Sequence, residues 1–341
     1  MTKLAVVILA AGHGTRMKSQ KNKVLHEVGG SPMIELAVES SIAVSDVPPV
    51  VVVSPFDKNV RSLIGDRVTY VEQEQQMGTG HATMMAADDL RGITEQVLVT
   101  YADMPLLRPE TMARLAVKQK TNGAAVAILV VVGDPASSFG RVITNPEGHV
   151  VEIVEVAEAR RLANAEELLQ IRDHNAGVYC FDSEWLWSNI TALPLRQARD
   201  NEEYYLTDTV GLAVSQGLLV EAIVVDDPDE CLGAGTRQEL AVVESAMKRR
   251  INKEWMDSGV TILDPAVTYI DRSVTIGKDT ILRPNTYLKG TTRIGANCLV
   301  GPNAAIRDSQ IGDGCHIEQA IVENATIDEG TLLEPFSHIQ G

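Results

Sequence analysis

The sequence has 341 residues, of which 45% are hydrophobic, and a chain of this length usually forms more than one hydrophobic core, so we expect two domains. Its 46 acidic and 30 basic residues give a formal charge of −16, which argues against a general nucleic-acid-binding role, because such binding needs clustered Lys and Arg. The N-terminus lacks a secretory-leader pattern and no apolar run approaches the ~18–20 residues that span a bilayer, which predicts a cytoplasmic protein.

The first two-thirds of the chain alternates strand-like and helix-like segments. Continuous runs rich in Val and Ile, typical of strands buried on both faces, occupy 4–10, 50–54, 96–103 and 124–132. Apolar residues at three- and four-residue intervals predict helices over 33–44, 80–90 and 109–120. This order predicts a doubly wound, Rossmann-like α/β domain over 1–235, with a mostly parallel sheet and ligands at the carboxyl ends of its strands.

A glycine-rich turn follows the first strand. Gly12 and Gly14 let the backbone approach a ligand and point N–H groups at phosphate oxygens, and Arg16 adds a bidentate cation. A dinucleotide-binding fingerprint would have a third glycine where Met17 stands, so the pattern argues against an NAD site. Because tight turns also use glycine without any ligand, a purely structural turn stays open at this point.

The last part of the chain has a six-residue period, which is the signature of a solenoid. We predict a linker helix over 236–259 and a parallel β-helix over 260–341, with a β-rich Greek-key domain as the alternative. After two irregular steps, to Ile311 and from Ile317 to Ile321, the period resumes through Ile327, Leu333 and Ile339. The regular aliphatic positions are Ile270, Ile276, Leu282, Leu288, Ile294, Val300 and Ile306, and small residues follow at Thr280, Thr286, Cys298 and Ala304.

The cysteines stand apart, without the spacing of a metal site. They are Cys180, Cys231, Cys298 and Cys315. We therefore expect reduced and mostly buried thiols.

Seven short motifs along the chain carry a resemblance to one family. They are LAAGHGTRM…KVLH (9–26), QEQQMGTGHA (73–82), YADMPLL (101–107), FGR (139–141), IVE (153–155), HNAG (174–177) and EYYLTD (203–208). In this order they resemble the bacterial bifunctional N-acetylglucosamine-1-phosphate uridylyltransferase/glucosamine-1-phosphate acetyltransferases, whose left-handed β-helix begins with similar repeats. The resemblance implies uridylyl transfer from UTP to N-acetylglucosamine 1-phosphate, giving UDP-N-acetylglucosamine and pyrophosphate for the cell envelope.

The resemblance also implies roles for individual positions. Arg16 and Lys23 would bind the triphosphate and the developing pyrophosphate, and Asp103 would bind Mg²⁺, the implied cofactor. Carboxylate oxygen is a ligand that Mg²⁺ prefers, and the Gln73 amide offers one donor and one acceptor to a base. The nucleotide would contact Leu9, Ala11, Gly12, Gly14, Gln73, Gly78 and Thr79, and the sugar would contact Tyr101, Gly140, Glu155, Asn175, Tyr205 and Thr207.

Ordinary structural roles stay open for some of these residues. Glu155 lies in an acidic stretch that suits a solvated helix face, Asn175 precedes a glycine and suits a turn, and Tyr205 could pack against its neighbours. Lys23 is one of three nearby lysines. His26 and His81 are expected to be structural, because this transfer needs no base at an ordinary hydroxyl.

The chain departs from the family pattern near several of these positions. Asn22 replaces a proline, which is expected to loosen the loop before Lys23. Ala102 replaces a glycine and is expected to crowd the backbone beside Asp103, and Val156 and Ala157 replace a polar pair, which weakens the expected sugar or phosphate contacts there. Gly235 stands where the second metal ligand, an asparagine, is expected, so Mg²⁺ binding should be weaker unless water or one of Asp226, Asp227, Asp229 and Glu230 substitutes.

The end of the sequence bears on a second activity and on assembly. Gln340 occupies the place of an arginine in the family, and the sequence stops at Gly341, so we expect no acetyl transfer. The flat faces of a β-helix prism predict a homotrimer.

Two alternative functions stay open. One is transfer with another sugar 1-phosphate or nucleotide, such as glucose 1-phosphate or dTTP. The other is a catalytically weak binding or scaffold protein, which the glycine at 235 favours.

Overall fold

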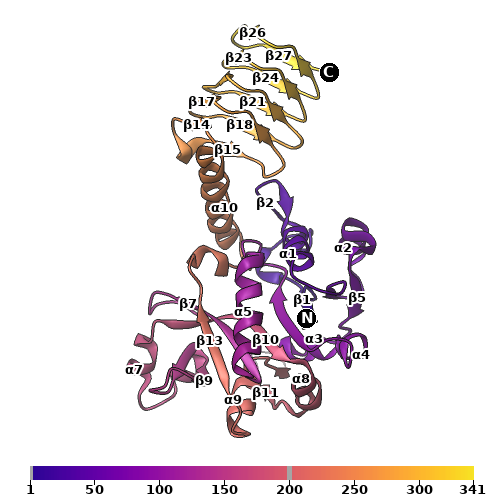
Figure 1. Ribbon diagram of the computed structural model, residues 1–341, viewed down its shortest axis with the longest axis vertical. Coiled ribbons are helices and arrows are strands. Elements are labelled where there is room, and N and C mark those ends of the chain that lie inside the picture. The colour runs from indigo at the N-terminus through magenta and orange to yellow at the C-terminus, as the bar shows by residue number, and fades with distance from the viewer. Residues whose placement is uncertain (1–2, 198–201) are drawn as a thin grey trace. The chain divides into compact units, whose positions relative to one another are not determined.

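The computed structural model describes residues 3–197 and 202–341. These residues form two compact units, one of residues up to 26 together with 33–239 and the other of 27–32 together with 240–341 (Figure 1). The boundaries expected for the domains and the linker stay a prediction. None of the helices in the described ranges is both long and apolar enough to cross a membrane.

The first unit is built on a nine-stranded, mostly parallel sheet, which confirms the predicted α/β class. Strand β10 is the antiparallel member between β6 and β7, whereas β1 pairs in parallel with β4 and β6. The order along the sheet is β13 (Val220–Val224), β7 (Val126–Val132), β10 (Asp173–Asp182), β6 (Gln96–Tyr101), β1 (Leu4–Leu9), β4 (Val50–Val53) and β5 (Thr69–Glu72), with β8 (Arg141–Thr144) and β9 (Val150–Val154) attached to β10.

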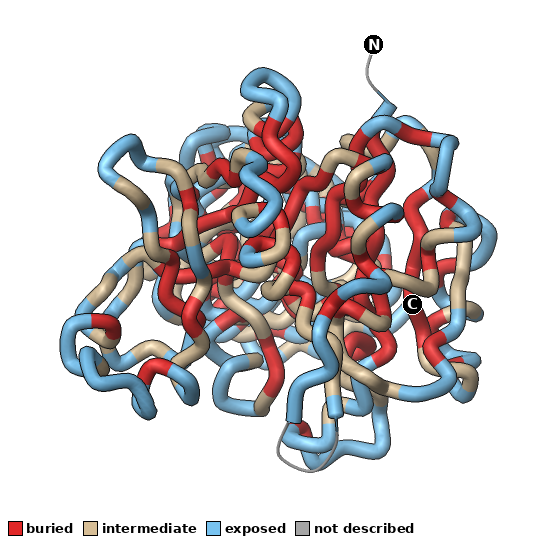
Figure 2. Tube along the Cα trace, turned by 90° about the horizontal axis from the view of Figure 1, so that it is seen from below, coloured by how far each residue is buried: buried red, intermediate tan, exposed pale blue. Residues whose placement is uncertain are grey.

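Two hydrophobic cores lie on the two faces of this sheet. Successive residues of β1 alternate between them, with Val6 and Ile8 in one core and Val7 and Leu9 in the other. Figure 2 shows the buried stretches of chain inside and the exposed loops around them. The first core takes side chains of α1 (Met33–Ile42), α2 (Lys58–Ile64) and α5 (Pro109–Asn122), and the second takes those of α3 (Gly78–Met84), α4 (Ala87–Leu90), α8 (Ser183–Asn189) and α9 (Asp208–Ser215).

The prediction of one continuous helix over 80–90 was wrong. The segment 80–90 forms α3 and α4 with a break between them. The N–H groups of Met85 and Ala86 bond to carbonyls only three residues back, which tightens the turn and ends α3. The Thr83 hydroxyl also bonds to the carbonyl of Thr79 2.9 Å away, a contact that bends helices.

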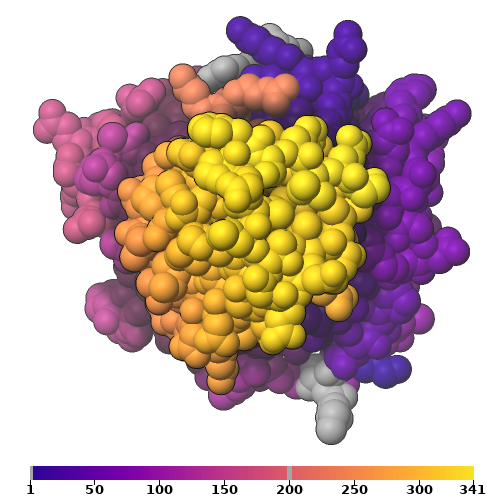
Figure 3. Space-filling view, turned by 90° about the horizontal axis from the view of Figure 1, so that it is seen from above, coloured from indigo at the N-terminus to yellow at the C-terminus, as the bar shows by residue number. Residues whose placement is uncertain are grey.

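The second unit contains the long helix α10 (Arg237–Asp257) from its fourth residue on, the hairpin β2 (Glu27–Val28) and β3 (Ser31–Pro32), and a β-helix. Three parallel sheets form the faces of the β-helix, which confirms the solenoid prediction, and Figure 3 shows its end face filled by side chains. The first sheet is β14 (Thr261–Ile262), β17 (Ile281–Leu282), β20 (Leu299–Val300), β23 (His316–Ile317) and β26 (Leu332–Leu333). The second is β15 (Tyr269–Ile270), β18 (Tyr287–Lys289), β21 (Ala305–Arg307), β24 (Ile321–Glu323) and β27 (His338–Gln340), and the third is β16 (Thr275–Ile276), β19 (Arg293–Ile294), β22 (Gln310–Ile311) and β25 (Thr326–Ile327).

The interior of the β-helix has the residues that the six-residue period predicted, with one error. Ile321 was expected inside, but its side chain is 45% exposed and Val322 is fully buried in its place. The step from the interior residue Ile317 to the next one, Val322, is therefore five residues, and Gln319 adopts a left-handed φ of 47° between them. Cys298 and Cys315 fill interior positions, and all four cysteines are buried and unpaired, as expected.

Candidate active site

The glycine-rich turn after β1 is shaped to bring Lys23 close. Gly14 has a φ of 60° and precedes a 3₁₀ turn over Thr15–Met17, and a Cβ atom on Gly14 would lie 2.5 Å from the Cβ of Lys23. Both facts require glycine there. A Cβ on Gly12 would meet nothing within 4 Å, so open space borders the turn where a ligand could approach. Leu9 and Ala11, the other nucleotide-site candidates here, are buried at the end of β1.

Lys23 and Asp103 come together at the same edge of the sheet. The Lys23 Nζ lies 2.6 Å from Asp103 Oδ2, and the two side chains are only 17% and 20% exposed. Asp103 follows β6, the parallel neighbour of β1, so the strand order brings the two residues together. Ala102 is buried, and its N–H bonds to the Leu9 carbonyl 3.1 Å away, which extends the pairing of the two strands toward the site.

Asn22 holds the Lys23 turn rather than leaving it unsupported. Its φ of −53° is in the range that a proline would impose, and its Oδ1 accepts the N–H of Val24 at 3.0 Å. Its Nδ2 donates to Asp57, whose other oxygen accepts the N–H of Val60 at the start of α2. The greater backbone freedom expected from the loss of a proline is therefore offset by the two side-chain hydrogen bonds of Asn22, the cap on Val24 and the bond to Asp57.

Gln73 is buried, and its amide has a defined orientation. Its Nε2 donates to the Gly78 carbonyl at 3.1 Å and lies 3.0 Å from Nδ1 of His81. Burial lowers the pKa of His81, which favours the neutral ring that can accept this hydrogen bond. The structural role expected for His81 thus includes orienting Gln73, with the Gln73 carbonyl oxygen left for a base. Sequence reasoning missed this contact because nothing in the local pattern relates the two side chains.

The start of α3 packs closely against the end of β12 (Glu202–Tyr204) and the residues that follow it. Gly78 has a φ of 89°, and a Cβ on it would lie 2.6 Å from the Tyr204 carbonyl oxygen. The Tyr204 N–H bonds to the Met77 carbonyl at 2.8 Å, and the Thr79 hydroxyl accepts the N–H of Leu206 at 3.0 Å. Gly78 and Thr79, both expected at the nucleotide, therefore also anchor the segment that carries Tyr205 and Thr207.

Most of the predicted sugar residues surround the end of β9 and the middle of β10. The Gly140 carbonyl accepts the N–H of Asn175 at 2.9 Å, and a Cβ on Gly140 would lie 3.2 Å from Oε1 of Glu155. The Asn175 side chain is itself bonded within the protein, to the Tyr179 hydroxyl at 2.7 Å and to the N–H of Gly177 at 3.0 Å. One N–H of its amide stays available for a ligand.

Tyr101 lies between the metal-site candidate and the sugar residues. Its ring rests on Gly177, where a Cβ would lie 2.9 Å from the ring. Burial and the nearby charge of Asp103 raise the pKa of Tyr101, so its hydroxyl stays protonated and bonds to Thr79. Gly177 and Tyr179 are site residues that sequence reasoning missed, because nothing in the local pattern shows that the glycine lies against the Tyr101 ring or that the tyrosine hydroxyl meets Asn175.

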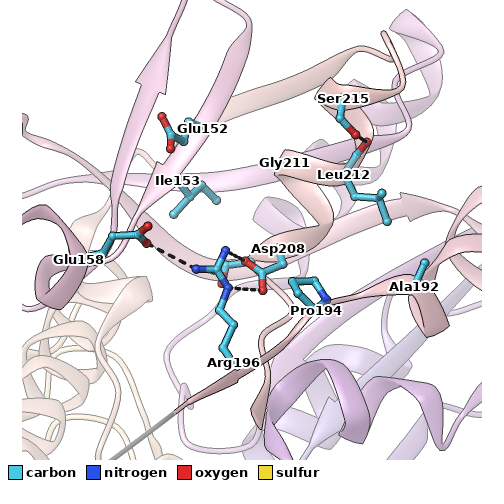
Figure 4. Close-up of a pocket in the computed structure, with 11 residues that line it drawn as sticks. Glu152, Ile153, Glu158, Ala192, Pro194, Arg196, Asp208, Gly211, Leu212 and Ser215 are labelled. Atoms are coloured by element: carbon cyan, nitrogen blue, oxygen red, sulfur yellow. Dashed lines mark hydrogen bonds and ion pairs between the residues drawn. The ribbon is translucent and has the colours of Figure 1, made fainter. Parts of the chain in front are cut away.

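An acidic cluster with one arginine adjoins the sugar residues. Its members are Glu155 at the end of β9, Glu158 in α6 (Val156–Ala159), Asp208 at the start of α9, and Arg196 in β11 (Leu195–Gln197). Figure 4 shows the last three beside a cavity of about 280 Å³. Burial first, and then the charges of Asp208 and Glu158, raise the pKa of Glu155, and Arg196 opposes that shift. A second short helix, α7 (Ala165–Gln170), packs with α6.

Three of the four acidic residues offered as substitute metal ligands have arginine partners. Asp226 pairs with Arg114, Asp227 with Arg108 at 3.1 Å, and the buried Glu230 accepts the N–H of Arg108 at 3.0 Å. In residues 3–197 and 202–341, no three His, Cys, Asp or Glu side chains gather in a way that could hold a metal ion. Asp103 with substrate phosphates still suits Mg²⁺, which is usually bound by one or two carboxylates and phosphate oxygens.

The glycine at 235 borders Asp103 and Arg16. The Ala234 N–H bonds to the Asp103 carbonyl at 3.0 Å, and a Cβ on Gly235 would lie 2.6 Å from an Arg16 guanidinium nitrogen. The N–H of Gly235 also bonds to Glu239 at 2.9 Å. The exposed guanidinium of Arg16 therefore fills the space that a side chain at position 235 would need. Arg16 thus lies close to the residue that follows Ala234, the hydrogen-bond partner of Asp103.

Comparison with known proteins gives consistent matches. Residues 6–183 match the MobA-like NTP transferase domain, and residues 273–308 match six bacterial transferase hexapeptide repeats. The chain is 39% identical over 337 residues to the bifunctional protein GlmU of Exiguobacterium sibiricum and 38% identical over 340 residues to that of Heliobacterium modesticaldum. These alignments cover 98% and 100% of this chain and 73% of each relative.

A solved structure adds support for the fold. CMP:2-keto-3-deoxy-manno-octonic acid synthetase complexed with CTP aligns with a TM-score of 0.55 over 73% of this chain and 100% of that protein. The sequence identity is 17%, so the match shows a shared fold only.

Proposed function

This chain belongs to the GlmU family, and from that premise we propose that it transfers a uridylyl group from UTP to N-acetylglucosamine 1-phosphate. Its first unit is a sugar-1-phosphate nucleotidyltransferase domain. The observation that carries the proposal is the 2.6 Å contact of Lys23 with Asp103. Two groups of residues complete the site: Gln73 and Gly78 are suited to a base, and the residues around Glu155 are suited to sugar hydroxyls.

The reaction joins two anions, so the site must offset their repulsion. A phosphate oxygen of the sugar phosphate attacks the α-phosphorus of UTP, and the bond from that phosphorus to the bridging oxygen breaks, releasing pyrophosphate. Arg16 and Lys23 would hold the phosphates and the charge that develops on the leaving group. Asp103 would hold Mg²⁺, which when bound neutralises charge on phosphate oxygens. No protein nucleophile is required.

Substrate recognition follows from the two groups of residues. The carbonyl oxygen of Gln73, with its amide nitrogen already used by Gly78 and His81, would accept a hydrogen bond from the base. Uracil has an imino N–H that suits such an acceptor. The backbone N–H of Gly140 and the side chains of Glu155 and Asn175 would bind the sugar, and Tyr205 and Thr207 would close around the acetamide and phosphate. The other nucleotide contacts would come from the turn after β1.

Assembly through the β-helix is part of the same proposal. Two of its faces expose apolar side chains, Ile281 and Leu332 on one and Tyr287 and Ile321 on the other. The third face carries polar outward residues, namely Thr275, Arg293, Gln310 and Thr326. A homotrimer would bury the two apolar faces of each prism and leave the polar face in water. Light scattering on the purified protein should give three times the chain mass.

The test is pyrophosphate release from UTP with N-acetylglucosamine 1-phosphate, with Mg²⁺ titrated and glucose 1-phosphate and dTTP run in parallel. Release that needs N-acetylglucosamine 1-phosphate and UTP supports the proposal. Release with glucose 1-phosphate or dTTP instead would support the first alternative. No release with any pair, from protein that still binds UTP, would favour a binding or scaffold protein. The absence of acetyl transfer stays a prediction, which an assay with acetyl-CoA and glucosamine 1-phosphate checks.

A further inference from the structure

Arg196 contacts two carboxylates, Asp208 at the start of α9 and Glu158 in α6, and acts at longer range on Glu155, which caps the start of α6. Its Nε donates to Asp208 Oδ2 at 2.8 Å, and its Nη2 lies 2.7 Å from Asp208 Oδ1, which makes a bidentate pair (Figure 4). Its Nη1 lies 3.7 Å from Glu158. The Asp208 side chain is only 11% exposed and that of Arg196 is 43% exposed, so water screens the pair from the arginine side only.

This pair closes a short loop that carries two predicted sugar contacts. The segment from Tyr204 to Asp208 is bonded to the start of α3 at its first end, through the N–H groups of Tyr204 and Leu206. At its other end, the carboxylate of Asp208 is held by Arg196. Arg196 itself lies in β11, which pairs with β12 immediately before the segment. The Arg196–Asp208 pair thereby joins the hairpin of β11 and β12 to the first turn of α9, with the Tyr205–Thr207 segment between them.

The same guanidinium sets the charge around Glu155. That carboxylate faces Asp208, Glu158 and the hydroxyls of Tyr101, Tyr179 and Tyr205, and within residues 3–197 and 202–341 the cation that acts on it is Arg196. Without Arg196, three carboxylates would face one another in a half-buried space, which disfavours their ionised forms.

We propose that Arg196 is a positioning residue of the sugar subsite, which holds the Tyr205–Thr207 segment against the sugar. The proposal rests on the uridylyltransferase function proposed above. Since Tyr204 and Leu206 are anchored to α3 independently of Arg196, loss of the pair should release the sugar side and leave the nucleotide side in place.

The test compares Arg196→Gln with Arg196→Lys, which keeps the charge but not the bidentate geometry. The control is Lys120→Gln, which removes a cation from an exposed pair with Glu95. For Arg196→Gln we expect KM for N-acetylglucosamine 1-phosphate to rise by about tenfold or more, with KM for UTP within about twofold. The acid limb of its pH profile should move to higher pH, Arg196→Lys should lie between it and the parent protein, and the control should match the parent.

A second measurement separates this inference from the function on which it rests. Hydrogen exchange should speed up in the peptide that covers Leu206 to Ser215 of Arg196→Gln, and not in the same peptide of the control. Unchanged exchange, or equal rises in both KM values, would overturn the inference. If the parent protein turns over no sugar phosphate, the proposed function fails, and exchange together with calorimetric binding of UDP-N-acetylglucosamine still decides whether Arg196 holds the segment.

Discussion

The ammonium group of Lys23 lies 2.6 Å from Oδ2 of Asp103, although the two residues are 80 positions apart in the sequence. The contact pairs the cation expected at the phosphates with the carboxylate expected at the metal. In this arrangement the carboxylate of Asp103 neutralises the ammonium group of Lys23. When both substrate phosphate and Mg²⁺ bind, Lys23 would pair with the phosphate and Asp103 with the metal, so that two ion pairs replace one.

Replacing Asp103 by Ala should lower kcat by at least about 100-fold while KM for UTP changes far less, because the carboxylate acts on charge that develops in the transfer. Steady-state kinetics over a Mg²⁺ titration measures both quantities. Asp103→Asn, which keeps the shape, is the matched variant and should also be impaired. Unaltered turnover in Asp103→Ala would remove this residue from the reaction.

Introducing a side chain at Gly235 should displace Arg16 without unfolding the protein. The added Cβ would lie 2.6 Å from the Arg16 guanidinium, and that group is the mobile end of an exposed side chain. We expect Gly235→Ala to keep the melting temperature within a few degrees and to raise KM for UTP. Arg16→Ala in the same background is the control, because once Arg16 is removed the added methyl group should have little further effect. Full additivity of the two changes would contradict the prediction.

Asn22 should support Lys23 through its side chain and not only through its backbone. Asn22→Ala loses the cap on Val24 and the tether to Asp57, which should cost about 1 kcal/mol of unfolding free energy and lower kcat/KM. Asn22→Pro keeps the φ of −53° but removes both bonds. Denaturant unfolding and kinetics on the two variants separate the contributions, and a fully active, fully stable Asn22→Ala would show that neither bond matters.

The half-buried Glu155 should make sugar binding sensitive to acid. Its pKa is raised, so its carboxylate takes up a proton at a higher pH than an ordinary glutamate, whose value is about 4.3. KM for the sugar phosphate should rise as the pH falls through that raised pKa. The sugar phosphate titrates as well, so Glu155→Gln is the control, and it should lack this part of the profile. An identical acid limb in both proteins would argue against the role of Glu155.

The same shift has a consequence for stability. A raised pKa in the folded state means that stability from this group is present below the ordinary glutamate pKa and lost as the pH rises through the folded value. At pH 7 the ionised carboxylate therefore destabilises the folded state, and Glu155→Gln should melt at a higher temperature than the parent protein. The difference should disappear below about pH 4. Thermal melts at the two pH values measure it.

The register of the β-helix predicts opposite effects for two adjacent residues. Val322→Lys places a charge in the interior and should cost at least about 4 kcal/mol of unfolding free energy. Ile321→Lys places the same charge on the surface and should change the stability of the chain itself by only about 0.5 kcal/mol. Since Ile321 lies on a face proposed to pack in a trimer, both variants should be compared as monomers at low concentration. Equal losses would contradict the register.

Local patterns in the sequence predicted the β-helix and four strands of the α/β sheet, whereas most candidate site residues came from the family resemblance. Runs of Val and Ile predicted β1, β4, β6 and β7 because strands buried on both faces need apolar side chains on both sides. The six-residue period predicted the β-helix because each coil must direct the same few positions into a narrow interior. The glycine-rich turn after β1 and the cation Arg16 within it were also readable, whereas Lys23 was one of three nearby lysines and was selected only through the family resemblance.

The tertiary structure decided which of these residues meet. The approach of Lys23 to Asp103 depends on the order of strands in the sheet, and the pairing of Arg196 with Asp208 depends on how a hairpin lies beside a helix. At the corner before β24, Ile321 and Val322 are equally apolar, so periodicity could not choose between them and the backbone conformation of Gln319 did. Periodicity reports only the surroundings of neighbouring residues along the chain, whereas charge, hydrogen bonding and packing at a site act between residues that only the folded backbone brings together.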